Sequence, residues 1–332
     1  MTLWSPAVTL ALCVVAVAVA ATATAGGGRA GCVQRTVRAR NDAELAAALA
    51  DAEAGTTVLV GEGSEPFRGP FVLADKAGTA DCPVVVEAAD GYRGYVTVPH
   101  GVALTVRNCT HVAVSLVVVR EAAVGVHVLG SRHVTLKSVW IEDTSDAAVV
   151  LNGTTTDSVV DDSYFYANAG QAVVVGTDDF SEEQRRPRDA PDARNAVSHC
   201  SFSTNARKAV VLGPSSAFTA VTHNVILPDH MASARDWAAI FVGNSYGNTI
   251  AYNTIENGVD DSMMYIAIMV YGTNALGTES PTRLEQNFIR LYTEGYAILV
   301  HPNTTPATVC VSNIVTDTHY ATPSNVPVDW SC

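Results

Sequence analysis

The sequence predicts an all-β, single-domain right-handed parallel β-helix of about eight coils with three strands each. Two observations predict this fold: a short apolar strand phrase that recurs along the chain, and an asparagine that recurs at one corner of the coil. Repeats of about 20 to 50 residues are typical of solenoids, and units made only of short Val- and Ile-rich strands indicate a β-solenoid. Because each unit contacts only its neighbours, we expect one body rather than two domains.

The first strand of each coil is an alternating apolar segment. Eight of these segments align: GVALTV (101–106), VGVHVL (124–129), AAVVL (147–151), QAVVVG (171–176), KAVVLG (208–213), AAIFVG (238–243), IAIMVYG (266–272) and YAILVHP (296–302). A second apolar phrase follows after a turn of variable length, as in FTAVTHNVI (218–226). The hydrophobic content of 48% agrees with an interior of stacked aliphatic side chains.

The corner asparagines are Asn224, Asn253, Asn287 and Asn313, each three residues after an inward apolar residue. Asparagine tolerates the left-handed backbone of a tight bend, and its amide can hydrogen-bond to the equivalent residue one coil away. We therefore expect an asparagine ladder, interrupted in earlier coils where Ser163 and Cys200 occupy this corner. The alternative is that asparagine is simply common in turns.

The N-terminal part of the chain carries two signals. Residues 1–25 match a signal peptide, with an apolar run and Ala23-Thr24-Ala25 before the expected cleavage; an uncleaved anchor is the alternative. Asn41 to Glu44, followed by Leu45 and Leu49, predicts a capped helix that covers the first coil. The expected divisions are 26–100 for the N-terminal cap and first coil, 101–320 for the repeats and 321–332 for a C-terminal tail.

Six cysteines remain after signal cleavage, which predicts disulfides in a secreted chain. Cys109 and Cys200 lie three coils apart, about 14 Å along the solenoid, and the Cα limit of roughly 7 Å excludes a bridge between them. Cys310, in the last coil, is expected to pair with Cys332. A second bridge is expected among Cys32, Cys82 and Cys109, which leaves Cys200 as a buried free thiol.

Three sequons, at Asn108, Asn152 and Asn303, could carry N-glycans. All three fall just after the first strand of a coil, so we expect that edge to face solvent. The insertion that begins at Asp178 reads as a solvated loop, with a calcium site at Asp178, Asp179 and Glu182 as the alternative. No other cofactor is indicated, and the histidines at 127, 133, 223, 230 and 301 lack metal-ligand spacing.

The chain resembles the pectin-lyase-like superfamily of right-handed β-helices, and its start is most similar to the chondroitinase B and alginate lyase family. The resemblance rests on residues 41–49, 57–60 and the Gly78-Thr79-Ala80-Asp81-Cys82-Pro83 stretch with the strand after it. It implies the fold and a polysaccharide substrate. The family's Asn-Lys-Ser and Leu-Arg-His-Gly motifs are not matched, because the comparable strand ends read Leu212-Gly213-Pro214 and Val242-Gly243-Asn244.

Charged and aromatic residues gather just before the first strands of successive coils. They are Arg207, Lys208, Arg235, Asp236, Trp237, Tyr265, Glu294 and Tyr296. Stacking in register places them along one edge, where they would line a sugar-binding groove. A polysaccharide lyase needs a base and a cation for the substrate carboxylate, so Lys208 is the expected base or neutraliser, Arg235 its partner and Tyr265 the proton donor. A solvated edge whose aromatics cover the apolar sheet is the alternative.

The net charge of −13 disfavours nucleic acid and any tightly bound polyanion. We therefore expect a secreted protein that binds, and as an enzyme cleaves, an extracellular polysaccharide, with no membrane contact after signal cleavage. The competing class is a catalytically inactive structural or surface β-helix that self-associates through its apolar sheet. The two differ in one observable: an enzyme needs an open groove from Arg207 to Tyr296, whereas the structural protein needs an uncovered apolar sheet.

Overall fold

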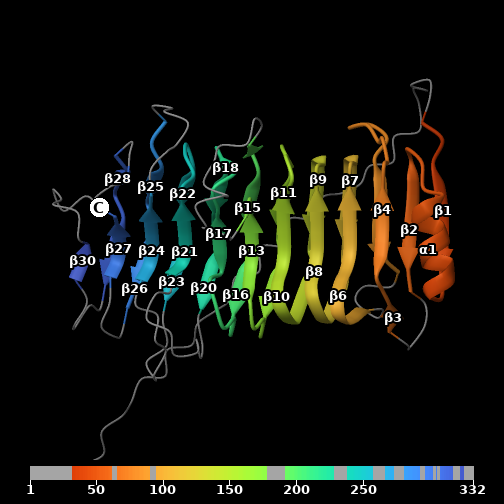
Figure 1. Ribbon diagram of the computed structural model, residues 1–332, viewed down its shortest axis with the longest axis horizontal. Helices are drawn as coiled ribbons and strands as arrows, with labels where there is room; N and C mark the ends of the chain where they lie inside the picture. Colours follow the sequence, from red (N-terminus) through yellow and green to blue (C-terminus); the bar gives the residue numbers. More distant parts are fainter. Residues whose placement is uncertain are drawn as a thin grey trace, which may run out of the picture. The chain divides into compact units, whose positions relative to one another are not determined.

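The computed structural model describes residues 32–61, 66–89, 95–177, 191–227, 238–256, 266–272, 280–291, 296–301, 304 and 307–316, and the backbone of 322–324. These residues belong to one compact unit, Cys32–Cys332. Its strands pair in parallel from coil to coil and form a β-solenoid (Figure 1). The predicted parallel β-helix is confirmed.

The coils stack their strands in three sheets, named here A, B and C, and the N-terminal β1 adds a strand to sheet A alone. Sheet A holds eleven strands: β1 (Arg35–Ala39), β2 (Thr56–Val60), β5 (Val84–Ala88), β7 (Thr110–Ser115), β9 (Arg132–Lys137), β11 (Val159–Asp161), β15 (Ala196–Ser198), β19 (Ala220–Thr222), β22 (Thr249–Ala251), β25 (Arg283–Glu285) and β28 (Val309–Val311). Parallel neighbours of this kind need a crossover between them, and here the other two sides of the coil supply it.

Three long strands bend from sheet B into sheet C: β6 (Tyr95–Arg107), β8 (Val118–Leu129) and β10 (Trp140–Asn152). Sheet B continues with β3 (Phe67–Arg68), β12 (Tyr164–Tyr166), β16 (Ser201–Ser203), β20 (Val225–Leu227), β23 (Thr254–Glu256), β26 (Phe288–Arg290) and β29 (Ile314–Thr316). Sheet C continues with β4 (Phe71–Ala74), β13 (Gln171–Val175), β17 (Val210–Leu212), β21 (Ala238–Gly243), β24 (Ile266–Tyr271), β27 (Tyr296–Val300) and β30 (Thr322–Ser324). Two short strands, β14 (Asp192–Ala193) and β18 (Ser216–Ala217), pair separately.

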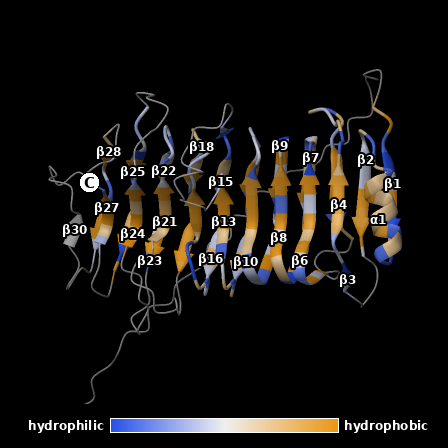
Figure 2. Ribbon diagram, viewed as in Figure 1, coloured by the Kyte–Doolittle hydropathy of each residue, from blue (hydrophilic) through white to orange (hydrophobic). Residues whose placement is uncertain are grey.

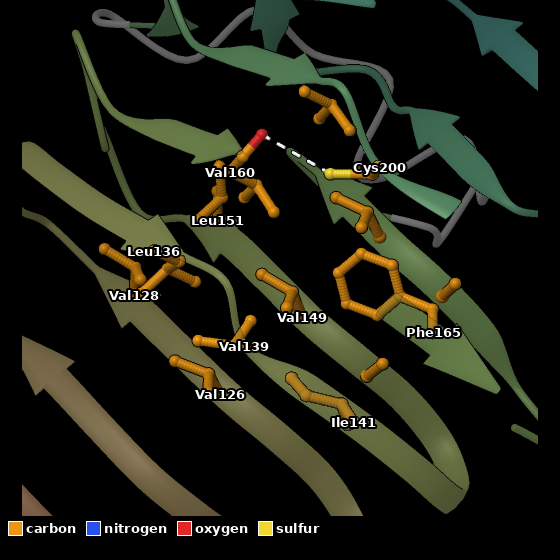
Figure 3. Close-up of a cluster of buried hydrophobic side chains, with 14 of the residues drawn as sticks. Val126, Val128, Leu136, Val139, Ile141, Val149, Leu151, Val160, Phe165 and Cys200 are labelled. Atoms are coloured by element: carbon orange, nitrogen blue, oxygen red, sulfur yellow. Dashed lines mark hydrogen bonds between the residues drawn. The ribbon is translucent and has the colours of Figure 1, made fainter. Parts of the chain in front are cut away.

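The core is built from columns of aliphatic side chains in equivalent positions of successive coils. In sheet A one column runs through Val58, Val86, Val114, Leu136, Val160, Val197, Val221, Ile250 and Leu284, all buried. Sheet strands alternate between inward apolar and outward residues, as Figure 2 shows along β8 and β9. The column continues across the coil to Phe165 and Val149, with Cys200 at one corner (Figure 3). Each buried aliphatic side chain contributes about 1.5–3 kcal/mol.

The asparagine ladder at the corner between sheets A and B is confirmed. The Nδ2 of Asn224 donates to Oδ1 of Asn253 at 3.0 Å, Asn253 to Asn287 at 2.9 Å, and Asn287 to Asn313 at 2.9 Å. Cys200 N–H donates to Oδ1 of Asn224 at 2.9 Å, so the ladder stops where the sequence departs from asparagine. A second, unpredicted ladder joins Asn168 to Asn205 at 2.8 Å, at the corner between sheets B and C.

The left-handed backbone at the ladder corner belongs to the residue before each asparagine, which corrects the sequence analysis. His223, Tyr252 and Gln286 have φ of 58°, 58° and 50°, while the asparagines that follow them do not have positive φ. The left-handed residue turns the chain so that the next side chain points inward. Asparagine is needed there for its hydrogen bonds, because its amide satisfies two coils at once.

The N-terminal helix is confirmed as α1 (Asp42–Ala50), with Asn41 as its N-cap accepting from Glu44 N–H at 2.9 Å. Its side chains Leu45 and Leu49 are buried in the same cluster as Val58. The helix therefore closes the apolar end of the first coil, which would otherwise present unpaired strand edges. Among the described residues no helix is long and apolar enough to cross a membrane.

The predicted bridge among Cys32, Cys82 and Cys109 is confirmed, and it joins Cys32 to Cys82. Cys109 is the member left unpaired: it is fully buried, its side chain lies in the core and its thiol donates to Arg107 O at 3.2 Å. Cys200 is a buried free thiol, as predicted. Cys310 is disulfide-bonded, and its expected partner, Cys332, lies outside the described residues.

Candidate functional site

The outward-facing side chains of sheet C form three rows that run along the solenoid axis, each row containing residues in equivalent positions of successive coils. The first row holds Gln171, Lys208, Ala238, Ile266 and Tyr296. The middle row holds Thr105, His127, Val150, Val174, Val211, Phe241, Met269 and Leu299. The last row includes Leu129, Asn152, Gly243 and Tyr271. Successive positions in a row lie about 4.8 Å apart.

The middle row has two polar members, Thr105 and His127. Val72 of β4 precedes them in register and is exposed, and from Val150 onward every position of the row is apolar. Val174, Val211 and Phe241 are 3%, 1% and 8% exposed, and they form an apolar cluster separate from the core. At these positions the apolar side chains of sheet C are covered. They do not form the large exposed apolar patch that a self-associating structural protein would need.

Lys208 stands at the edge of this apolar row. It immediately precedes Ala209 and β17, is half-buried, and its Nζ lies 5.2 Å from the centroid of the Phe241 ring on the next coil. An ammonium over an aromatic face is held by the ring's electrostatic field. The chain contains three lysines, and Lys208 lies two residues before the start of β17 in sheet C.

Two polar pairs occupy the opposite side of the face. His127 Nε2 and Asn152 Oδ1 are 2.9 Å apart, and the rings of Tyr271 and His301 meet edge to face with centroids 4.6 Å apart. Neither His127, considered above only as a metal ligand, nor Tyr271 was among the predicted site residues. The alternation of VGVHVL and IAIMVYG was the available signal, because it places both side chains outward.

Of the predicted edge, the structure describes Arg207, Lys208 and Tyr296. Lys208 and Tyr296 share the first row, three coils or about 14 Å apart. Arg207 is exposed and lines a small cavity of about 10 Å³ with Phe202, Asn205 and Ala209. The remaining predicted site residues, Arg235, Asp236, Trp237, Tyr265 and Glu294, lie outside the described residues.

Metal-binding groups do not cluster in the part of the chain that the structure describes, where no three His, Cys, Asp or Glu side chains come together. His133 stacks on His111 at 4.5 Å and His223 on His199 at 5.1 Å, both at exposed corners of sheet A. The calcium alternative at Asp178, Asp179 and Glu182, and His230, lie outside the described ranges.

Two of the three sequons are described, and both lie where strands of sheet C end. Asn108 is exposed and its Nδ2 donates to Asp75 Oδ1 at 3.2 Å, while Asn152 is half-buried in the last row. Asn303 lies outside the described residues. N-glycosylation at these positions stays a prediction.

Solved structures share this arrangement of coils. An alginate lyase from Paenibacillus sp. str. FPU-7 superposes with a TM-score of 0.70 at 20% identity, covering 87% of this chain and 99% of that one. A pectate lyase superposes with a TM-score of 0.56 at 12% identity, covering 88% and 82%. The chain has the parallel β-helix fold of these lyases. The A-module of a mannuronan C-5 epimerase from Azotobacter vinelandii has the same β-helix, with a TM-score of 0.50 at 16% identity over 85% and 90% of the two chains.

No protein-family model and no curated protein matches the chain. The β-helix neighbours are too distant in sequence to transfer a residue role. They confirm the fold that the N-terminal resemblance implied, and the outer face of sheet C has to be interpreted from its own side chains.

Proposed function

We propose that this protein is a secreted polysaccharide lyase whose substrate lies at the edge of sheet C that carries Lys208. The observation that carries the proposal is Lys208, a half-buried cation seated on Phe241 at the edge of an apolar sheet face. The alginate and pectate lyases that share the fold act on chains of uronate sugars, according to their names, and this supports the same substrate class.

The dimensions of the fold suit an extended sugar chain. The solenoid repeats every 4.8 Å or so along its axis, close to the length of one sugar unit in an extended polysaccharide. A chain lying along this edge would meet an equivalent position once per sugar. On the face beside it, the half-buried Val150 and Met269 are separate apolar contacts, because Val174, Val211 and Phe241 between them are buried. The polar pairs His127–Asn152 and Tyr271–His301 offer hydrogen bonds.

The chemistry is a β-elimination. A base removes the proton on the carbon next to the uronate carboxylate, the electron pair forms a carbon–carbon double bond, and the glycosidic C–O bond breaks with a proton delivered to the leaving oxygen. Lys208 acts either as that base or as the cation that neutralises the carboxylate. In the rest of the proposed site, Arg235 is the partner of Lys208 and Tyr265 is the proton donor. The proposed sugar contacts are Arg207, Asp236, Trp237, Glu294 and Tyr296.

Secretion is part of the same proposal. The Cys32–Cys82 disulfide and the bonded Cys310 are typical of an oxidising compartment. The signal-peptide match of residues 1–25 supports export, and a polymeric sugar substrate is found outside the cell.

The test is turnover of alginate, pectate and glycosaminoglycans, followed by the ultraviolet absorbance of the unsaturated uronate ends. Wild-type protein should produce these ends, and Lys208→Ala should reduce kcat/KM by at least about 100-fold. Lys208→Arg separates the two roles, because arginine keeps the charge but cannot act as a base. Retained activity in Lys208→Arg identifies a neutraliser, and lost activity identifies the base.

The matched control is Lys137→Ala, which removes a lysine from the outer face of sheet A and should leave turnover unchanged. No unsaturated product from any of the polymers, with or without calcium, would contradict the lyase proposal. Unchanged turnover in Lys208→Ala would leave the lyase in place but remove Lys208 from its site.

A further inference from the structure

A second face of the solenoid carries an ordered aromatic row. On the outer side of sheet B, the strand register places one residue from each of four successive coils in a row: Tyr95, Val118, Trp140 and Tyr164. The row beside it contains Arg120, Glu142 and Tyr166. Only 7% of the chain is aromatic, so four aromatic side chains on three of these four coils are a local concentration. We call the set Tyr95, Arg120, Trp140, Glu142, Tyr164 and Tyr166 the aromatic platform.

The platform is held by specific contacts. The indole Nε1 of Trp140 donates to Glu142 Oε2 at 2.7 Å, and Arg120 Nε lies 2.6 Å from the other carboxylate oxygen. The Glu142 side chain is only 14% exposed, so it fixes the planes of both partners. Side chains that are fixed before a ligand arrives lose less conformational entropy on binding.

The aromatic rings extend this order across the coils. Arg120 lies over the Tyr95 ring at 5.2 Å, the Trp140 and Tyr164 rings meet edge to face at 5.1 Å, and Tyr164 and Tyr166 are stacked at 6.0 Å. Trp140 and Tyr164 are half-buried, and Tyr166 is 39% exposed. The platform is therefore a rigid surface with accessible aromatic groups rather than part of the core.

Charge and spacing indicate the ligand. The single cation Arg120 is neutralised by Glu142, and the exposed carboxylates Glu121 and Asp143 follow directly on the same strands. This surface repels polyanions, while aromatic rings with neighbouring hydrogen-bonding groups suit sugar rings. Tyr95 and Trp140 are two coils, or about 9.6 Å, apart, which approximates one disaccharide of an extended chain.

We propose that the aromatic platform binds a neutral, extended polysaccharide chain that runs along the solenoid axis. It lies on a different sheet from Lys208, so it is an anchoring surface that is separate from the proposed lyase site. Its ligand class also differs, because sheet C is proposed to take uronate chains. An enzyme with both surfaces would be held on a neutral polymer while it acts on an acidic one.

The experiment is binding of hexameric oligosaccharides of β-1,4-linked glucose, mannose and xylose to the full mature protein, measured by calorimetry. At least one of these neutral hexamers should bind, and Tyr166→Ala and Trp140→Phe should each weaken that binding by about tenfold. Tyr252→Ala is the matched control, since Tyr252 is 48% exposed but lies at the ladder corner, and it should bind as wild type does.

Separate outcomes distinguish this proposal from the lyase proposal. Lys208→Ala should keep neutral-hexamer binding, and Tyr166→Ala should keep the turnover of short uronate oligomers. No binding of any neutral hexamer, equal binding by Tyr166→Ala and Tyr252→Ala, or binding of uronate hexamers alone would overturn the platform. A loss of self-association in Tyr166→Ala, seen as a change of mass in solution without any sugar binding, would identify a second copy of the chain as the occupant and would also overturn it.

Discussion

Lys208 and Phe241 lie on neighbouring coils with the ammonium nitrogen 5.2 Å from the centroid of the ring. This pair joins the cation of the proposed site to the apolar row of sheet C. Phe241→Leu keeps an apolar side chain but removes the ring, and it should reduce affinity for uronate oligomers by about two- to fivefold, in line with 0.5–1 kcal/mol for a cation–π contact.

A double-mutant cycle separates this effect from general packing. If Phe241 acts by positioning Lys208, then Phe241→Leu should have no further effect on affinity in the Lys208→Ala background. An equal loss in both backgrounds would mean that Phe241 contacts the substrate or supports the sheet independently of the lysine. Thermal unfolding of each variant checks that the fold is intact.

The asparagine ladder predicts a graded loss of stability at Asn253. Asn253→Ala leaves the buried amide of Asn224 without its acceptor, and the free energy of unfolding should fall by about 3 kcal/mol. Asn253→Ser should lose less, because Ser163 at the same corner accepts from Val139 N–H at 3.2 Å through its hydroxyl.

Urea unfolding of these variants is the measurement, with Asn108→Gly as the exposed control. Asn108 makes one side-chain contact at the surface, and glycine adopts its φ of 52° without strain, so the unfolding free energy should change by less than about 0.5 kcal/mol. Equal losses for Asn253→Ala and Asn108→Gly would show that the buried ladder bonds do not stabilise the fold.

The Asp157–Arg194 ion pair predicts acid sensitivity. Arg194 donates from Nε and Nη2 to both Asp157 oxygens at 2.6 and 2.7 Å, and this hydrogen bonding lowers the Asp157 pKa to about 2. A carboxyl whose pKa is depressed by folding stabilises the protein above its unfolded pKa of about 4, and this contribution is lost as the pH falls towards 2. Because Arg194 is largely exposed, solvent screens the pair and keeps this contribution small.

Asp157→Asn should therefore be less stable than wild type near pH 6 or so and equal to it near about pH 2. Urea midpoints at the two pH values measure the difference, and added salt should reduce it at the higher pH. A difference that is the same at both pH values would mean that the asparagine perturbs packing and that the ion pair contributes nothing.

The free thiols should be unreactive in the folded protein. Burial raises the pKa of Cys200 to about 12 and also raises that of Cys109, so neither forms a thiolate at neutral pH. A thiol reagent should label neither residue in the native state and both after unfolding in urea. Rapid native labelling of Cys200 would show that its corner of the coil opens.

Repetition made much of the fold predictable. The alternating strand phrases gave the coils, the capped segment at Asn41 gave α1, and four asparagines in equivalent positions gave the ladder. Each of these signals is local or recurs at a fixed offset, so it survives without knowledge of the contacts. The prediction that the ladder asparagines themselves have the left-handed backbone was wrong, because φ at a corner depends on which of two neighbouring residues turns the chain.

The cysteines show the same limit. Strand spacing along the solenoid was enough to separate Cys109 from Cys200, because a parallel stack fixes the distance between coils. It could not choose among Cys32, Cys82 and Cys109, since that choice depends on the direction of each side chain. Cys82 meets Cys32 beside Gly55, whose φ of +83° and lack of Cβ leave room for the two sulfurs, whereas Cys109 points into the core.

The sequence by itself determined the strand repeat, the capping helix, the corner asparagines and the position of Lys208 at the edge of a coil. Only the tertiary structure decided what those positions face: that Lys208 meets Phe241, that the apolar row of sheet C is buried on its outer side, and that Trp140 and Tyr166 share an outer face of sheet B. The reason is that coil lengths vary along this chain. Side chains far apart in sequence become neighbours only when hydrogen bonding between coils sets their register.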